Sequence, residues 1–112
     1  MTIRLSDLVL EVKKLELEEV RTNTAKLFEF VIQTKLLPEL SSVLENHFGP
    51  PLKPAGKNPS KEAAEETSAF GGVRKDQTLY FTKSPEGFYY ALLWPWANGL
   101  LLTVKIVQEA KS

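Results

Sequence analysis

Two turn sequences near the C-terminus constrain the fold of this chain more than any other feature. Residues 97–100 (Ala-Asn-Gly-Leu) contain Asn-Gly, the preferred pair for a two-residue hairpin turn with positive φ at both positions. Residues 84–87 (Ser-Pro-Glu-Gly) have proline second and glycine fourth, which is typical of a type I turn followed by a glycine bulge. The turns predict antiparallel strands over 77–83, 88–96 and 100–108.

The turn geometry also predicts the register of these strands. A two-residue turn at 98–99 places Ala91 opposite Ile106, and a bulged three-residue loop at 84–87 places Phe81 opposite Ala91. One face is then almost wholly apolar and is expected to receive the helices. Its members are Leu79, Phe81, Tyr89, Ala91, Leu93, Leu100, Leu102, Val104 and Ile106. Without the bulge, Tyr80 would point into the core, because a one-residue slip inverts every side chain.

The opposite face of this predicted sheet is rich in aromatic residues. It consists of Thr78, Tyr80, Thr82, Phe88, Tyr90, Leu92, Trp94, Trp96, Leu101, Thr103, Lys105 and Val107. Tyrosine and tryptophan combine a large apolar body with a polar tip and are enriched at interfaces. A contiguous patch of this kind exceeds what a monomer normally exposes to water. We therefore take Tyr80, Tyr90, Trp94, Trp96 and Lys105 as candidate binding residues.

Three kinds of cover would explain such a face. A helix of the same chain could pack on it, a second copy of the chain could meet it across a two-fold axis, or a small molecule or peptide could bind in a groove on it. The sequence leaves these alternatives open.

Residues 1–48 have a helical pattern. Aliphatic residues recur at helical spacing between Leu8 and Leu15, although residues 8–20 also alternate as a strand would, so both readings stay open. Residues 22–24 (Thr-Asn-Thr) could cap a second helix or lie within one long helix. The second helix would carry Leu27, Phe28, Val31 and Ile32 on one face.

A third helix is predicted over residues 38–48. Pro38 suits its first turn, and Gly49 suits a left-handed C-terminal cap. Residues 49–76 are rich in proline and glycine and form a loop with a short helix over 60–66, capped by Ser60. The expected fold is a single α+β domain over residues 1–112, with N-terminal helices packed on a C-terminal three-stranded antiparallel meander over 77–108.

Composition excludes several functional classes. Fourteen Lys and Arg balance fourteen Asp and Glu, which argues against a general nucleic-acid binder. The chain has no cysteine and one histidine, so it offers no thiol nucleophile and no two-histidine metal motif. We find no catalytic motif, no membrane span and no signal-peptide core, and we expect a cytoplasmic protein without metal or cofactor.

Two functional hypotheses follow. The first is a non-enzymatic interaction protein, a homodimer or a binder of another protein, that acts through the aromatic face. The second is a small-molecule binder or minor enzyme with a pocket for an anion between the sheet and loop 53–75. Lys57, Arg74 and Tyr80 would supply its polar contacts.

Overall fold

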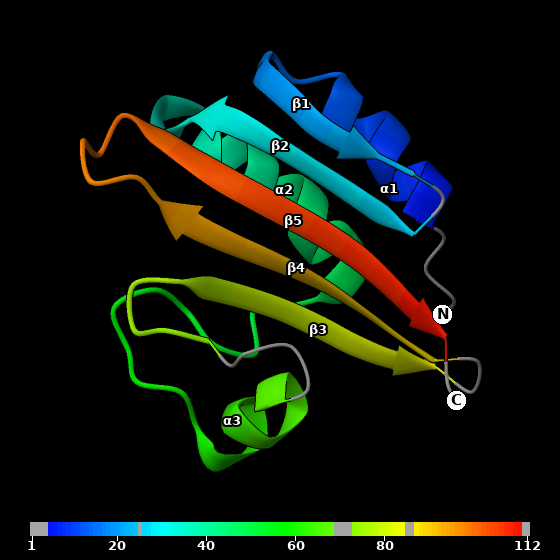
Figure 1. Ribbon diagram of the computed structural model, residues 1–112, viewed down its shortest axis with the longest axis vertical. Coiled ribbons are helices and arrows are strands. Elements are labelled where there is room, and N and C mark those ends of the chain that lie inside the picture. Colours follow the sequence, from blue (N-terminus) through cyan, green and yellow to red (C-terminus); the bar gives the residue numbers. More distant parts are fainter. Residues whose placement is uncertain (1–4, 25, 69–72, 85–86, 111–112) are drawn as a thin grey trace.

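The computed structural model describes residues 5–24, 26–68, 73–84 and 87–110 (Figure 1). The elements in chain order are α1 (Leu5–Lys13), β1 (Leu17–Asn23), β2 (Leu27–Gln33), a 3-10 turn (Thr34–Leu36), α2 (Leu37–Phe48), α3 (Lys61–Thr67), β3 (Thr78–Ser84), β4 (Gly87–Pro95) and β5 (Leu101–Ala110). The strands form one antiparallel sheet of five in the order β1-β2-β5-β4-β3. The fold is α+β, with strands from both ends of the chain.

The sheet is larger than the sequence predicts. The expected meander is present as β3, β4 and β5, but β1 and β2 extend the sheet beyond β5, where Phe30 pairs with Val104. In the meander alone β5 would be an edge strand, and an uncovered edge is a template for aggregation. The pairing of β2 with β5 joins segments that lie far apart in the sequence. Local sequence patterns do not predict pairing over such a separation.

The prediction that residues 27–32 form the face of a second helix is wrong. Residues 22–24, which were expected to cap that helix, lead instead into the turn between β1 and β2. The Thr24 N–H donates to the Leu27 carbonyl at 2.8 Å, and the Thr24 hydroxyl accepts from the Leu27 N–H at 3.0 Å. A threonine hydroxyl stabilises turns in this way because it binds nearby backbone donors. For residues 8–20 both readings apply in part, helix in α1 and strand in β1.

The helix predicted over 38–48 is confirmed as α2. Pro38 lies in its first turn, where the missing N–H costs no hydrogen bond. Gly49 follows the helix with φ of 80°, and its N–H donates to the Glu45 carbonyl at 2.8 Å. Glycine adopts this left-handed conformation without the steric cost that a Cβ would bring.

The short helix predicted over 60–66 is confirmed as α3. The Ser60 hydroxyl accepts from the Ala63 N–H at 3.1 Å, which satisfies one of the free donors at the helix start. The predicted end of this helix at residues 71–72 lies outside the described part of the chain.

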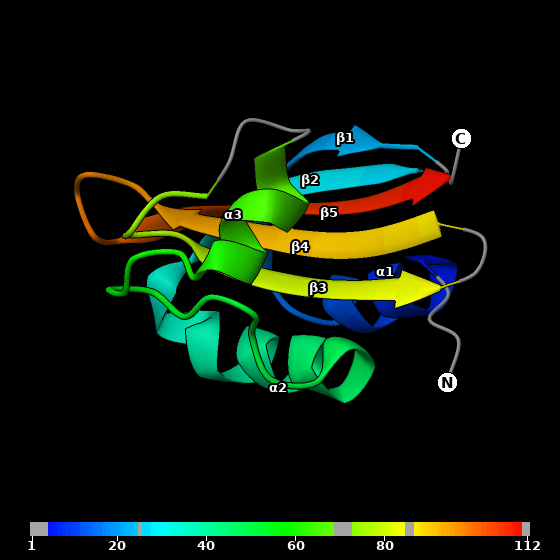
Figure 2. The same ribbon diagram turned by 90° about the horizontal axis from the view of Figure 1, so that it is seen from below.

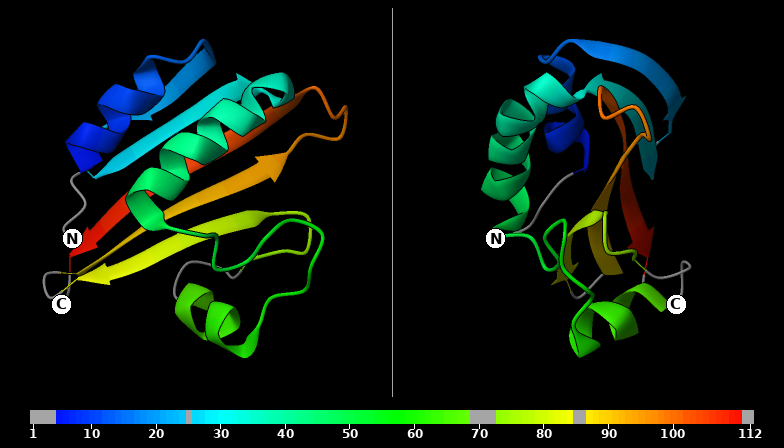
Figure 3. Two further views of the ribbon diagram at one scale, coloured as in Figure 1. Left: turned by 180° about the vertical axis from the view of Figure 1, so that it is seen from behind. Right: turned by 90° about the vertical axis from the view of Figure 1, so that its left-hand side faces the viewer.

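Helices α1 and α2 lie together on one side of the sheet, which we call the helix face (Figure 3). The main core lies between these helices and the strands, with Phe28 and Phe30 in contact at 5.0 Å between ring centroids. The buried members of this core are Leu8, Val12, Phe28, Phe30, Ile32, Leu40, Leu44, Tyr80, Ala91, Leu93, Leu102, Val104 and Ile106.

Helix α3 lies on the other side of the sheet, at the β3 edge (Figure 2). We call this side the second face. A smaller apolar cluster lies under α3, and its buried members are Ala63, Val73, Leu79, Tyr90 and Val107. A helix of the same chain therefore covers one part of the aromatic face that the sequence predicts.

The predicted register of β4 and β5 is confirmed, with Ala91 opposite Ile106. The connecting loop is longer than predicted, because the Trp96 N–H donates to the Leu101 carbonyl at 2.9 Å. The loop therefore comprises four residues, and Leu100, which we expected in the core, is 70% exposed.

The turn at residues 97–100 also differs in its backbone conformation. Gly99 has φ of 72°, but Asn98 does not have positive φ, so the turn is not of the type that was predicted. The Gly99 N–H donates to the Trp96 carbonyl at 3.0 Å. Four-residue hairpin loops are most often built around an ordinary type I turn, and they keep the same register because they are centred on the same pair.

The predicted register of β3 is wrong by one residue. Ser84 pairs with Gly87, so Tyr80 rather than Phe81 lies opposite Ala91. Tyr80 is therefore part of the main core, and Phe81 packs with the cluster under α3. Apolar alternation could not decide between the registers, because both faces of β3 are covered.

Lys53 binds the segment between α2 and α3 to the edge strand β3 through backbone and side-chain hydrogen bonds. The Leu79 N–H donates to the Lys53 carbonyl at 2.9 Å, and the Lys53 N–H donates to the Leu79 carbonyl at 3.2 Å. The Lys53 side chain is 1% exposed, and its ammonium donates to the carbonyls of Pro54 at 3.1 Å, Lys75 at 2.6 Å and Gln77. All three ammonium donors are thus used inside the protein.

Candidate functional site

In the described parts of the chain, no helix lies over one part of the second face. Figure 1 looks onto this face, where β1, β2, β5 and β4 lie open to the viewer and α3 lies beside β3. We call this region the open half. Its side chains are Glu19, Arg21, Glu29, Val31, Trp94, Trp96, Thr103 and Lys105. Both tryptophans are half-buried.

Strand pairing arranges the open half in rows that cross the sheet. One row contains Glu19, Val31, Thr103 and Trp94, from β1, β2, β5 and β4. The next row contains Glu29 and Lys105, flanked outside the open half by Thr22 on β1 and by Leu92 on β4, which packs against the cluster under α3.

Strand β1 contributes to this surface through two bulges. Its register with β2 shifts at Glu18 and again at Arg21. A bulge re-aims side chains and twists the strand, and on an edge strand it also discourages pairing with another chain. The second bulge brings the Arg21 Nε within 3.0 Å of Glu19 Oε2.

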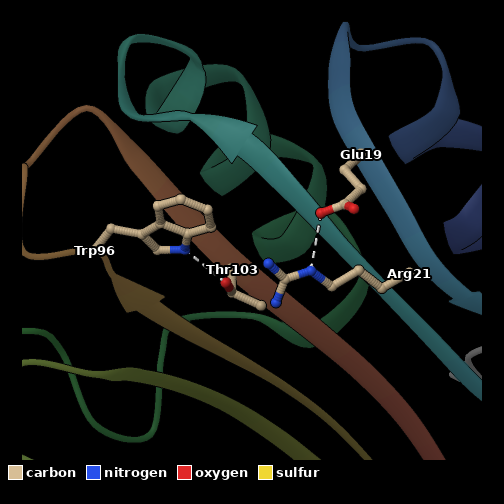
Figure 4. Close-up of polar contacts among 4 residues, drawn as sticks. All are labelled: Glu19, Arg21, Trp96 and Thr103. Atoms are coloured by element: carbon tan, nitrogen blue, oxygen red, sulfur yellow. Dashed lines mark hydrogen bonds and ion pairs between the residues drawn. The ribbon is translucent and has the colours of Figure 1, made fainter.

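Trp96 joins this ion pair to β5. Its residue follows the end of β4, and its indole folds back over β5, where Nε1 donates to Thr103 Oγ1 at 2.8 Å (Figure 4). The Arg21 guanidinium carbon lies 5.7 Å from the centroid of the indole ring. A cation–π contact of this kind contributes about 0.5–1 kcal/mol at a partly exposed site. Glu19, Arg21, Trp96 and Thr103 thus form one line of contacts across the sheet.

The small side chains beside this line are shielded from water. Val31 and Thr103 are each 1% exposed, although they lie on the open half, where none of the described helices covers β2 and β5. Trp96, which binds Thr103, is itself held both at its nitrogen and at its ring. A surface held in this way loses little side-chain entropy when a partner binds.

Glu29 and Lys105 lie side by side in the adjoining row. They are direct cross-strand partners on β2 and β5, and both are half-buried. Opposite charges in this position usually attract one another. The described side chains nevertheless form no ion pair between these two residues. Each charge can therefore bind a partner outside the chain.

The predicted binding residues divide between three places. Trp94, Trp96 and Lys105 lie in the open half. Tyr80 is buried on the helix face, 6.0 Å from Phe48 between ring centroids, and its burial raises its pKa. Placing Tyr80 on the aromatic face was therefore wrong.

Tyr90 is on the second face as predicted, but it is buried in the cluster under α3. Burial, with a further contribution from the charge of Glu109, raises the pKa of Tyr90 to about 12. Its hydroxyl is therefore neutral in the folded protein at all ordinary pH values.

Lys57 and Arg74 do not line one pocket with Tyr80. Both are exposed, on segments joined by a hydrogen bond of 2.8 Å from the Gly56 N–H to the Lys75 carbonyl, whereas Tyr80 faces α2 across the sheet. A hollow of about 310 Å³ does lie beside α3. Its lining contains one acid, Glu62, and one base, Lys83, and includes neither Lys57, Arg74 nor Tyr80.

Glu19, Arg21 and Glu29 are residues of this site that the sequence pattern did not indicate, because residues 1–48 as a whole have a helical pattern. A signal was present in residues 27–33, where phenylalanines and β-branched residues are concentrated. Such residues favour strands. The bulges that aim Arg21 leave no comparable signal.

Comparisons with known proteins identify no relative of this chain. The chain matches no family model, and no significant match is found among curated proteins or solved structures. Among the described residues, no group of three or more His, Asp or Glu could hold a metal ion, and no helix is long and apolar enough to cross a membrane.

Proposed function

We propose that this protein is a non-enzymatic interaction protein that binds a second copy of itself through the open half. The observation that carries the proposal is the Arg21 guanidinium placed on the Trp96 indole, with half-buried Trp94 in the same open half of the second face. Tryptophan and arginine are enriched among the residues that dominate binding energy at interfaces. Tryptophan and tyrosine combine a large apolar body with a polar tip, which suits them to a surface that becomes covered on association.

The charges of the open half favour a second copy as the partner. Two bases, Arg21 and Lys105, lie among two acids, Glu19 and Glu29. A two-fold interface uses the same patch on both subunits, so a patch that carries both signs can meet its own complement. We expect a dissociation constant on the order of 10 µM.

Sedimentation equilibrium of the wild-type chain and of Trp94→Ala tests this proposal. We expect a wild-type dimer at about 100 µM and at least a roughly tenfold weaker association of the variant, because truncation removes a hot-spot side chain. Leu10→Ala is the matched control, since Leu10 is 62% exposed on α1, away from the open half. A wild-type monomer at this concentration, or equal effects of both substitutions, would overturn the proposal.

A further inference from the structure

We propose that the two copies pack face to face about a two-fold axis parallel to β2 and β5, so that Lys105 of each copy faces Glu29 of the partner subunit. This inference rests on the self-association proposed above and specifies its register.

The sheet geometry leaves two simple arrangements. When two identical sheet faces meet, the two-fold axis lies midway between the sheets, about 5 Å above each. An axis across the strands would stack β5 on β5. With the contact centred on the rows of Thr103 and Lys105, Lys105 would then meet Leu101, Thr103 or a second Lys105 of the partner subunit, depending on the position of the axis, and none of these is a carboxylate. An axis along the strands, between β2 and β5, stacks β2 of one copy on β5 of the other and keeps each row aligned with itself.

The charges select the axis along the strands. Glu29 and Lys105 are half-buried, adjacent across β2 and β5, and not paired with one another. Covering them without a partner would be costly, because a charge removed from water must be compensated. The axis along the strands gives both charges a partner, and symmetry makes the pair twice.

The neighbouring row fits the same arrangement. In it β4 of one copy lies over β1 of the other, which brings Trp94 over the partner's Glu19–Arg21 pair. The contact is centred on the rows of Thr103 and Lys105. Most of the cluster under α3 then lies to the side, because α3 is at the β3 edge (Figure 2).

Charge reversal and mixing test this register. We expect Glu29→Lys alone and Lys105→Glu alone each to weaken association about tenfold or more in sedimentation velocity, because each homodimer would contain two like-charge contacts. An equimolar mixture of the two variants should form a heterodimer of near wild-type affinity, in which both contacts are opposite in sign. Within either variant chain the neighbours still repel, so only contact between chains can produce this rescue.

Neutral variants cover the case in which circular dichroism shows that a reversed chain is unfolded. A homodimer of Glu29→Gln or of Lys105→Gln has neither of the two Glu29–Lys105 contacts between chains. The heterodimer of the two variants has one of them, so it should be the favoured species in the mixture. A mixture that associates no more tightly than its components overturns the register. If the wild type still dimerises and Trp94→Ala still weakens it, the proposed function stands without this register. A monomeric wild type overturns both.

Discussion

Replacing Lys53 with methionine tests whether one buried ammonium holds the segment between α2 and α3 on the sheet. Methionine keeps a long apolar side chain and removes the charge together with its three hydrogen bonds. If these hydrogen bonds stabilise the fold, the substitution should weaken the packing of this segment next to the backbone bridge between Lys53 and Leu79. The free energy of unfolding should then fall.

The size of the loss in unfolding free energy depends on which hydrogen bonds each carbonyl retains in the variant. The Lys75 carbonyl still accepts from the Gly56 N–H at 2.8 Å, whereas the carbonyls of Pro54 and Gln77 lose the ammonium. Pro54 is exposed, so water can replace the ammonium at its carbonyl, whereas Gln77 is half-buried. Leaving one such acceptor unpaired costs about 1–3 kcal/mol, and removing a desolvated charge offsets part of that cost. We expect a net loss of about 1 kcal/mol, or about 5 °C in Tm for a domain of this size.

Urea denaturation followed by tryptophan fluorescence measures this difference. Lys57→Met is the matched control, because Lys57 is exposed four residues further along the chain and its replacement should change stability by less than about 0.5 kcal/mol. A Lys53→Met protein as stable as the control would refute the reasoning, since the carbonyls would then need no ammonium.

The same experiment has a pH dependence of known sign. Burial lowers the pKa of Lys53 from 10.5, and the nearby charge of Asp76 partly opposes this. Between the lowered pKa and 10.5 the unfolded chain binds more protons than the folded one, so this group makes wild-type stability rise with pH in that window. The methionine variant should lack this rise.

Two further predictions concern single hydroxyl groups. Tyr90 ionises near pH 10 when unfolded and near 12 when folded, so its contribution to stability is present below pH 10 and is lost as the pH rises from 10 to 12. The loss should reach roughly 3 kcal/mol in the wild type, and urea titrations of Tyr90→Phe should lack this fall; parallel pH curves for the two proteins would contradict it. The Thr34 hydroxyl is buried and has no hydrogen-bond partner among the described residues. Thr34→Val should therefore raise the urea midpoint, by about 1 kcal/mol of stability, and a lower midpoint would show that the hydroxyl is bonded after all.

The correct and the incorrect sequence predictions differ in the sequence separation of the contacts that stabilise each element. The caps at Gly49 and Ser60 were predictable, because each depends on one residue and a backbone group within four positions. The β1–β2 hairpin was not predictable. The spacing of its apolar residues fits both a helix and a strand, and only the pairing of β2 with β5 decides between them.

The candidate site was predictable to the same extent. Trp94 and Lys105 were assigned to the aromatic face because the 97–100 loop sets the register of β4 against β5 locally. Arg21 and Glu29 were not assigned to it, because they reach it only when β2 pairs with β5 and a bulge turns Arg21 onto Trp96.

By itself the sequence determined α2, α3 and the β4–β5 hairpin, since short-range hydrogen bonds and turn residues decide each of them. Only the tertiary structure decided the register of β3 and the choice of strand over helix for β1 and β2. The physical reason is that both faces of β3 are covered, so Tyr80 and Phe81 could each have been buried on either side. The same tertiary contacts decide which aromatic residues α3 covers and which the open half leaves exposed to a partner.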